Sequence, residues 1–393
     1  MMKRVLPLLM LLLCLCAPAL AEEAQDITGK CDISSSYYRN TFRVNDGKTK
    51  TRFDKDIKKK QSNWIEFETP KDKPAHGLYL IWSQDPAKVS LEIWNDDLNG
   101  WEHFTDVNAG QFVHEYVALP GVKRFRLHST DEKGSMPLVE MNVLSEGELP
   151  DWVQVWQPSL TKADLLVFVA HPDDEYIFMG GAIPYYIAEG YDVQVAFATT
   201  QSEVRLHELL NALWVAGGRN YPELLMLYDK LCEKARTAYK YWGGEDNALD
   251  VFAAMIERVQ PEVVITHDIN GEYGHGAHMA CADMSLQVIR DGKRALQWQP
   301  KKLYLHLWKE GEIMVEWEQP HENLGGRTPL EVAAEAFKEH KSQQGFSAET
   351  RSGREFKFKV HSHGMFDNAK FGLAYSSVGE DVLKNDFMEN VGE

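Results

Sequence analysis

The 393-residue sequence is poor in cysteine and lacks a Gly-x-Gly-x-x-Gly motif. Two of its five cysteines, Cys14 and Cys16, fall in an N-terminal apolar run, which leaves Cys31, Cys232 and Cys281. Three thiols do not make a disulfide framework, although one pair could form, and their spacing does not indicate a metal site. Without the glycine motif, nothing in the sequence supports a dinucleotide site.

Basic residues are outnumbered by acidic ones. The chain has 42 Lys and Arg against 59 Asp and Glu, which gives a formal net charge of -17 at pH 7. Because nucleic-acid phosphates repel so acidic a protein, we expect no nucleic-acid partner. The sequence also lacks low-complexity tracts, and its length allows two domains.

Only the N-terminal stretch has a long apolar run. Lys3 and Arg4 precede the apolar residues 5–16, and Ala19, Leu20 and Ala21 follow. This order is typical of a secretory signal, so we expect cleavage after Ala21 and a secreted protein. The run is short for a membrane span, and an uncleaved anchor is the alternative. We expect no transmembrane segment in the mature chain, residues 22–393.

Residues 29–149 show the pattern of an all-β domain. Apolar and polar residues alternate at 64–68, 89–94, 124–127 and 139–143. Turn residues separate these runs, among them 45–47, 72–74, 85–86, 99–100 and 120–121. Several short strands at close spacing predict a β-sandwich or jelly roll.

Two features of this region allow a binding role as well as a structural one. Trp64, Trp82, Trp94 and Trp101 could stack on sugar rings, but most of them are expected to fill the core because aromatic rings bury large areas. The basic run 48–60 could contact an anionic polymer, but lysines also blunt exposed strand edges.

The start of this region weakly resembles discoidin-like, galactose-binding-type domains. The resemblance rests on the order of Asn45, Asp46 and Gly47, then Thr49 and Thr51, before the strand that starts at Trp64. It implies that the first domain is a carbohydrate-binding accessory module.

From residue 151 onward, strands alternate with helices. The polar segment 145–150 contains Gly and Pro and is a plausible domain boundary. Buried strands are expected at 165–170, 193–198, 263–266 and 303–308, and helices at 178–190, 203–216, 249–259 and 328–343. This alternation predicts an α/β domain with a mostly parallel sheet and helices on both faces. The segment 356–393 has no clear pattern.

Two clusters of ionisable residues follow two of these strands. His171, Asp173 and Asp174 come after the first strand, and His275 and His278 come after the third. Because parallel strands end at one edge of a sheet, the clusters can converge there. A hydrolytic zinc site needs three His or carboxylate ligands and an open position for water. One carboxylate and one imidazole are then left over for acid–base chemistry and for binding the oxyanion.

Each cluster also has a purely structural interpretation. Asp173 or Asp174 could cap the following helix, and His275 and His278 could lie on the surface at a helix start. Finding both clusters at strand ends of one sheet favours a metal site. Other histidines are weaker candidates. We expect His361 and His363 to face solvent, and His340 to be placed by a favourable helix dipole.

The order and spacing of these motifs resemble the PIG-L (LmbE-like) zinc-dependent de-N-acetylases. The resemblance rests on residues 170–175, Gly180 and Gly181, Arg205 with Glu208, and residues 271–278, and it spans about residues 162–306. It implies a Rossmann-like fold for the second domain, residues 151–393. It also implies removal of an acetyl group from an N-acetylglucosamine-type sugar.

The resemblance also assigns roles by position. It gives the metal to three residues, His171, Asp174 and His278. Asp173 is then the general base, and His275 is the second acid/base or oxyanion residue. Tyr273 helps to hold the oxyanion, and Arg205 binds substrate or braces the site. The implied ion is Zn²⁺, although Fe²⁺ suits the same ligands.

Two positions depart from the family pattern. Family members often carry Asp before the last His ligand, where this sequence has Ala277. The segment 199–202 also lacks the Gly expected before the helix that carries Arg205. The orienting role of such an Asp, and substrate contacts near that segment, are therefore expected to differ.

We therefore expect a secreted metal-dependent hydrolase that removes N-acetyl groups from N-acetylglucosamine-containing glycans or glycoconjugates. One alternative is an amidase that acts on a non-sugar N-acyl group. The other is a non-catalytic glycan-binding or adhesion protein. The spare base argues against the second alternative, because binding alone does not need one.

Overall fold

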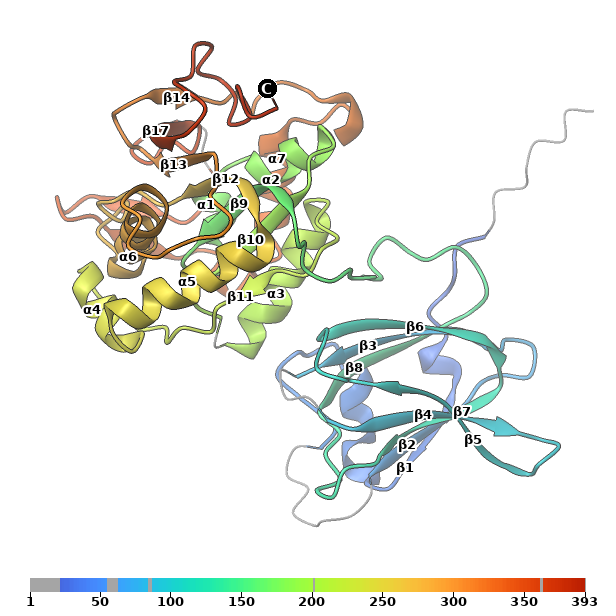
Figure 1. Cartoon of the computed structure of the whole chain (residues 1–393). Helices are drawn as coiled ribbons and strands as arrows, with labels where there is room; N and C mark the ends of the chain where they lie inside the picture. Colours follow the sequence, from blue (N-terminus) through green and yellow to red (C-terminus); the bar gives the residue numbers. More distant parts are fainter. Residues whose placement is uncertain (1–21, 55–62, 84–86, 201, 361–362, 393) are drawn as a thin grey trace, which may run out of the picture.

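The computed structural model describes residues 22–54, 63–83, 87–200, 202–360 and 363–392. The expected signal segment, residues 1–21, lies outside them, as do residues 55–60 of the basic run, the turn at 85–86 and His361. The N-terminal part of the chain is built from antiparallel strands, and the rest combines a sheet with helices (Figure 1).

Two antiparallel sheets make up the N-terminal part. Five strands have the order β1-β2-β7-β4-β5, and three have the order β6-β3-β8. The strands are β1 (Asp32–Ser35), β2 (Trp64–Glu68), β3 (Ala75–Trp82), β4 (Val89–Asn95), β5 (Gly100–Val107), β6 (His114–Val122), β7 (Arg124–Ser129) and β8 (Leu138–Leu144). Short 3₁₀ helices, η1 (Thr28–Lys30) and η2 (Tyr38–Asn45), flank β1. The all-β fold predicted ahead of the α/β region is confirmed.

Alternation of side chains builds the core between these sheets. In β2, Ile65 and Phe67 are fully buried, and β7 repeats the pattern with Phe125 and Leu127. They share one apolar cluster with Leu78 of the second sheet. Because successive strand residues point to opposite faces, the period-2 pattern commits one face of each strand to this core.

Most of the four tryptophans do not fill the core as expected. Only Trp82 is fully buried. Trp94 and Trp101 are half-buried and pack edge to face with their ring centroids 5.3 Å apart. The guanidinium of Arg124 lies 4.4 Å from the Trp94 ring centre, so a cation–π contact supports this pair outside the core.

A seven-stranded mixed sheet forms the centre of the C-terminal part. Its order is β11-β10-β9-β12-β13-β17-β14. Strands β11, β10, β9, β12 and β13 pair in parallel, whereas β17 and β14 are antiparallel. The strands are β9 (Ala163–Val169), β10 (Val193–Phe197), β11 (Glu223–Leu224), β12 (Pro261–Thr266), β13 (Lys302–His306), β14 (Glu312–Met314) and β17 (Lys370–Ser376). The predicted α/β fold with a mostly parallel sheet is confirmed.

Helices cover both faces of this sheet. They are α1 (Asp174–Ile177), α2 (Ala182–Ala188), α3 (Glu203–Val215), α4 (Ala235–Tyr241), α5 (Glu245–Val259), α6 (Gly276–Ser285), which continues into the π-helical turn η3 (Leu286–Arg290), and α7 (Pro329–Phe337). The 3₁₀ turns η4 (Glu322–Leu324) and η5 (Lys341–Gln343) flank α7. In β9, Leu165 and Val167 belong to one apolar cluster, and Leu166 and Phe168 to the other. Burial on both faces explains why the strand is apolar throughout.

Three sequence-based boundaries were wrong. Residues 178–190 do not form one helix, because the chain breaks between α1 and α2 where Gly180 adopts φ of +58° beside Asn368. The helix predicted at 328–343 ends at Phe337. The predicted turn at 120–121 lies inside β6.

The unplaced tail contributes a strand to the main sheet. β17 pairs with both β13 and β14. Buried Lys302 of β13 forms an ion pair with Asp381 further along the tail, and the hydroxyl of Tyr304 donates to the same carboxylate at 2.7 Å. These contacts link residues about 80 positions apart, which no local pattern encodes.

Several further observations bear on the sequence-based expectations. Cys31, Cys232 and Cys281 are free thiols. None of the helices in the described ranges is both long and apolar enough to cross a bilayer. The N- and C-terminal parts contact each other through buried His114 of β6 and His207 of α3, whose ring nitrogens lie 3.0 Å apart.

Candidate metal centre

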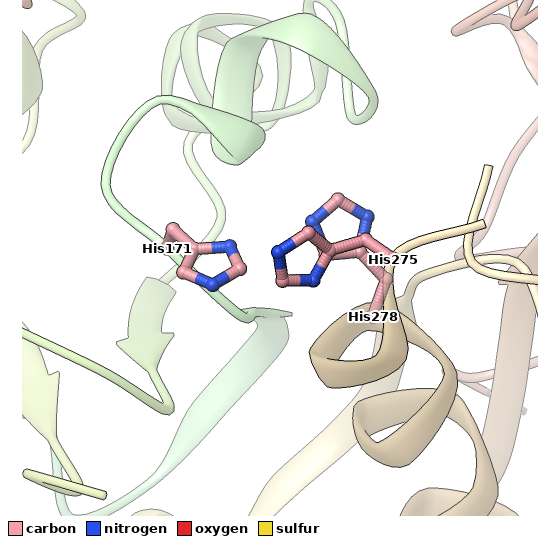
Figure 2. A group of neighbouring side chains, drawn as sticks. All are labelled: His171, His275 and His278. Carbon is pink, nitrogen blue, oxygen red and sulfur yellow. The ribbon is translucent and has the colours of Figure 1, made fainter. Parts of the chain in front are cut away.

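The carboxyl ends of β9 and β12 bring the two predicted clusters together. These strands are parallel neighbours, with Val167 opposite Ile265. His171 follows β9, and α6 carries His278 in its first turn with His275 at its N-cap. Figure 2 shows the three imidazoles facing one another, and the ring centroids of His171 and His275 are 4.7 Å apart.

Two overlapping groups of side chains could hold a metal ion within the part of the chain that the structure describes. The donor atoms of each group lie within 4.8 Å of one another, and the groups are His171, His275, His278 and Asp174, His267, His278. The three predicted ligands span both groups. Asp174 Oδ2 lies 3.0 Å from His171 Nδ1 and 3.3 Å from His278 Nε2.

The hydrogen bonds around His278 fit a metal ligand. Its Nδ1 donates to Glu272 Oε2 at 2.7 Å, which places the lone pair of the neutral ring on Nε2. That Nε2 atom is buried and has no hydrogen-bond partner among the described residues. In contrast, His267 Nε2 already accepts a hydrogen bond from the backbone N–H of Ala170 at 3.0 Å. This difference favours His278 over His267 as a ligand.

Charge in the cluster follows the same arrangement. Burial alone raises the pKa of Asp174, but the imidazoles of His278, His171 and His267 hold it well below its usual value. Burial alone lowers the pKa of His171, yet its hydrogen bonds with Asp174 and Asp229 raise it to about 9. An ionised carboxylate held among imidazoles is a donor set that suits Zn²⁺ or Fe²⁺.

Asp173 is held in a strained conformation beside these residues. Its φ is +117°, which is rare for a residue other than glycine. Its backbone N–H donates to Glu175 Oε2 at 2.7 Å, and its carboxylate accepts from Arg205 at 2.9 Å. Asp173 is the N-cap of α1, but its side chain makes no capping hydrogen bond. Burial raises its pKa to about 6 against the opposing charge of Arg205.

A tight turn sets the orientation of His275. Gly271 adopts φ of +71°, and a Cβ there would lie 2.3 Å from the carbonyl oxygen of His275. The His275 Nδ1 accepts from the backbone N–H of Ala277 at 3.2 Å. Burial, with the neighbouring His171 and His278, holds the pKa of His275 well below its usual value, so the ring is neutral.

The candidate ligands border a cleft of about 290 Å³, which we call the metal cleft. It is lined by His171, Asp173, Asp174, Arg205, Asp229, Lys230, Leu231, Tyr273, His275, Gln343 and Phe358. Six of the seven predicted site residues therefore line one cleft. The seventh, His278, is fully buried beneath them.

Comparison with known proteins identifies the family. The family model for PIG-L, described as GlcNAc-PI de-N-acetylase, matches residues 166–289. Residues 166–289 form a PIG-L domain. A 1D-myo-inositol 2-acetamido-2-deoxy-alpha-D-glucopyranoside deacetylase from Tsukamurella paurometabola is 28% identical over 189 residues. That match covers 38% of this chain, and the chain spans 64% of the length of that relative.

Solved structures resemble each part of the chain. N,N'-diacetylchitobiose deacetylase from Pyrococcus horikoshii aligns with 47% of this chain and 70% of its own, at 18% identity and a TM-score of 0.34. A family 32 carbohydrate-binding module from Streptococcus pneumoniae EndoD aligns with 31% of this chain and 100% of its own, at 10% identity and a TM-score of 0.25.

Several residues around the PIG-L domain's cluster were missed from the sequence. Glu272 accepts from the Nδ1 atoms of His278, His267 and His306, and His306 comes from β13. Asp229 lies 3.5 Å from His171 Nε2. Glu272 and His267 stood in the quoted motif region, but Asp229 lies in a loop without a signal.

One histidine outside the PIG-L domain was misjudged. His340 does not sit at an exposed helix end but is fully buried, and its Nε2 lies 2.7 Å from Glu175 Oε1. Because the other oxygen of Glu175 binds the Asp173 backbone, His340 supports the strained residue indirectly. The expectation for His363 was right, since its side chain is 80% exposed.

Proposed function

We propose that this chain is a metal-dependent hydrolase that removes N-acetyl groups from N-acetylglucosamine-containing glycans or glycoconjugates. The observation that carries the proposal is that Asp173 and His275 line one cleft with the candidate ligands. A glycan-binding protein needs neither a buried carboxylate base nor a spare imidazole beside a metal site. The PIG-L match and the name of the Tsukamurella relative support the same chemistry.

The metal would be held by His171, Asp174 and His278. We propose Zn²⁺, with Fe²⁺ as the alternative, because both accept imidazole and carboxylate ligands. When bound, such an ion polarises the acetamide carbonyl and lowers the pKa of a coordinated water to about 7. The orphaned Nε2 of His278 supports this assignment.

Asp173 would act as the general base. With a pKa of about 6 it is ionised at pH 7 and can take a proton from the attacking water. Arg205 holds one carboxylate oxygen of Asp173, which fixes the direction of the other. We therefore assign Arg205 a bracing role, with substrate contact in the metal cleft as a second role.

His275 and Tyr273 would face the developing oxyanion. Because His275 Nδ1 accepts from Ala277, the neutral ring carries its proton on Nε2. That N–H can donate to the oxyanion and then to the leaving amine, which yields acetate and a free amino sugar. Burial raises the pKa of Tyr273 well above its usual value, so its hydroxyl also remains a donor.

The remaining parts of the chain have proposed roles as well. We assign residues 1–21 as a secretory signal cut after Ala21, on the pattern of Lys3, Arg4 and the apolar run. Residues 29–149 would be an accessory domain, with glycan binding as its proposed role, and residues 151–393 the deacetylase domain. N-terminal sequencing of the protein purified from culture medium tests the cleavage.

Substituting Asp173→Asn tests the mechanism. The amide cannot accept the proton, so acetate release from N-acetylglucosaminides should fall by about 100-fold or more. Metal content, measured by elemental analysis, should stay close to that of the wild type because Asp173 is not an assigned ligand. Asp246→Asn, which changes a 92% exposed side chain on α5, is the matched control and should keep full activity.

Two outcomes would contradict this proposal. Wild-type turnover by Asp173→Asn would remove the assigned base. Turnover of non-sugar N-acyl amides without any turnover of N-acetylated sugars would make the protein an amidase of another class. A panel containing both kinds of substrate distinguishes these results.

A further inference from the structure

A second hollow adjoins the metal cleft. It has a volume of about 630 Å³ and shares Leu231, Tyr273, His275 and Phe358 with the metal cleft. We call it the hairpin cleft, because its outer wall is residues 347–351 of a two-stranded hairpin. The two hollows are continuous, since they have the same four side chains as a common border.

The hairpin is fixed beside the metal centre although it lies outside the PIG-L match. It consists of β15 (Ser347–Glu349) and β16 (Glu355–Lys357). Arg351, in its turn, donates to the backbone carbonyl of Glu233 at 3.2 Å. The same side chain packs on Gly274, where an added Cβ would lie 2.8 Å from Arg351 Nε.

The sizes of the two hollows divide a substrate between them. Small-molecule sites usually measure about 300–1,000 Å³. The metal cleft, at about 290 Å³, lies at the lower end of that range, whereas the hairpin cleft is about twice as large. A substrate whose acetamide reaches His275 therefore has most of its remaining space in the hairpin cleft.

The lining of the hairpin cleft suits a polyhydroxylated ring. Tyr273 and Phe358 form its aromatic border, with ring centroids 6.0 Å apart, and offer surfaces on which the C–H face of a sugar can pack. The hydroxyl of Ser347 and the carboxylates of Glu233 and Glu349 can accept hydrogen bonds from sugar hydroxyls. Two carboxylates against one guanidinium disfavour an anionic ligand.

We propose that the hairpin cleft is a second sugar subsite, so that the substrate is a neutral glycan of at least two rings. The ring that carries the acetamide occupies the metal cleft, and its glycosidically linked neighbour lies between Phe358 and the hairpin. This inference rests on the proposed de-N-acetylase function and adds the substrate class to it.

Filling the hairpin cleft tests the inference. Ala348 lines this cleft but not the metal cleft, so Ala348→Trp should obstruct the second ring alone. We expect kcat/KM for N,N',N''-triacetylchitotriose to fall at least tenfold and that for N-acetylglucosamine to change less than threefold. Glu349→Ala, which removes one acceptor without adding bulk, should lower the trisaccharide value severalfold. Lys357→Trp on the same hairpin, outside the lining, is the matched control.

A binding measurement separates failure of this inference from failure of the proposed function. Calorimetric titration of each full-length variant with the same two sugars reports the subsite even without turnover. Weaker trisaccharide binding in Ala348→Trp, with unchanged monosaccharide binding, supports the subsite. Equal losses for both sugars, or no loss for either, overturn it. Absence of acetate release from the wild type counts against the deacetylase function alone.

Discussion

At the scale of single residues, Glu272 organises the metal centre. Its fully buried carboxylate accepts hydrogen bonds from three imidazoles and from the backbone N–H of Asp268. Burial alone raises its pKa, but the charges of His267 and His278 hold it well below the usual value. Although Ala277 removes the Asp expected beside His278, the Nδ1 atom of that ligand still has a carboxylate partner.

Replacing this carboxylate should weaken metal binding. In Glu272→Gln, one acceptor oxygen becomes an NH₂ group that faces an imidazole N–H, so the His278 ring loses its fixed orientation. We expect metal affinity to fall by about 10–100-fold, the usual effect of removing such a partner. Competition with a chromophoric chelator measures this. The matched control is Glu262→Gln, on β12 but beside Lys301 at the surface.

The apo proteins need the same comparison. Loss of a buried acceptor also lowers stability, so the melting temperature of each metal-free variant should be recorded. An unchanged metal affinity in a folded Glu272→Gln variant would show that His278 is oriented without the carboxylate.

At the scale of elements, α7 connects the tail of the chain to the catalytic strand end. Beyond its end, buried His340 pairs with Glu175 of α1, and the backbone N–H of Ser342 donates to Glu208 of α3 at 2.7 Å. The helix begins with a capping box, in which Thr328 and Glu331 bond each other's backbone N–H groups. A stable start to α7 therefore helps to hold the site.

Removing the cap should cost stability. Thr328→Ala leaves the backbone N–H of Glu331 without its acceptor, and we expect the free energy of unfolding to fall by about 1 kcal/mol. Thr328→Ser keeps a hydroxyl and should stay within about 0.5 kcal/mol of the wild type. Urea unfolding measures both. Equal losses in the two variants would assign the effect to the lost methyl group rather than to the cap.

At the scale of the whole molecule, a buried histidine pair joins the two parts of the chain. His114 Nδ1 lies 2.8 Å from the hydroxyl of Tyr79, and its Nε2 lies 3.0 Å from His207 Nδ1. Beside this pair, Phe112 packs against Tyr221 with ring centroids 5.2 Å apart. Burial lowers the pKa of His207 to about 4, and burial together with His207 holds the pKa of His114 well below its usual value.

This pair should make stability fall in acid. An unfolded His takes up a proton near pH 6.5, whereas folded His207 stays neutral down to about pH 4. The unfolded state therefore binds more protons between these values, and the stability present above pH 6.5 is lost as the pH drops. In His207→Gln that loss should be smaller, by roughly 2 kcal/mol between pH 7 and pH 4.5.

The test is urea unfolding at several pH values. His363→Gln, which changes an exposed side chain, is the matched control. Identical pH profiles for His207→Gln and the wild type would show that His207 is protonated to the same extent in both states.

Much of the architecture could be predicted because the information is local. The apolar run of β9, the alternation in β2 and β7, and the capping box of α7 each involve neighbouring residues only. The spacing of His171, Asp173 and Asp174 after one strand, and of His275 and His278 after another, indicated two halves of a site. Parallel strands end at one edge, so their meeting followed from the predicted sheet.

What only the tertiary structure decided depends on contacts between distant residues. The break at Gly180 arises where Asn368 of the tail leaves no room, and β17 joins the sheet through pairing with β13 and β14. Likewise, Glu272 became the centre of a histidine cluster because β13 delivers His306 to it. The sequence by itself determined which residue types and local elements are present. Long-range packing decided their partners, because burial and charge pairing depend on neighbours that local patterns do not specify.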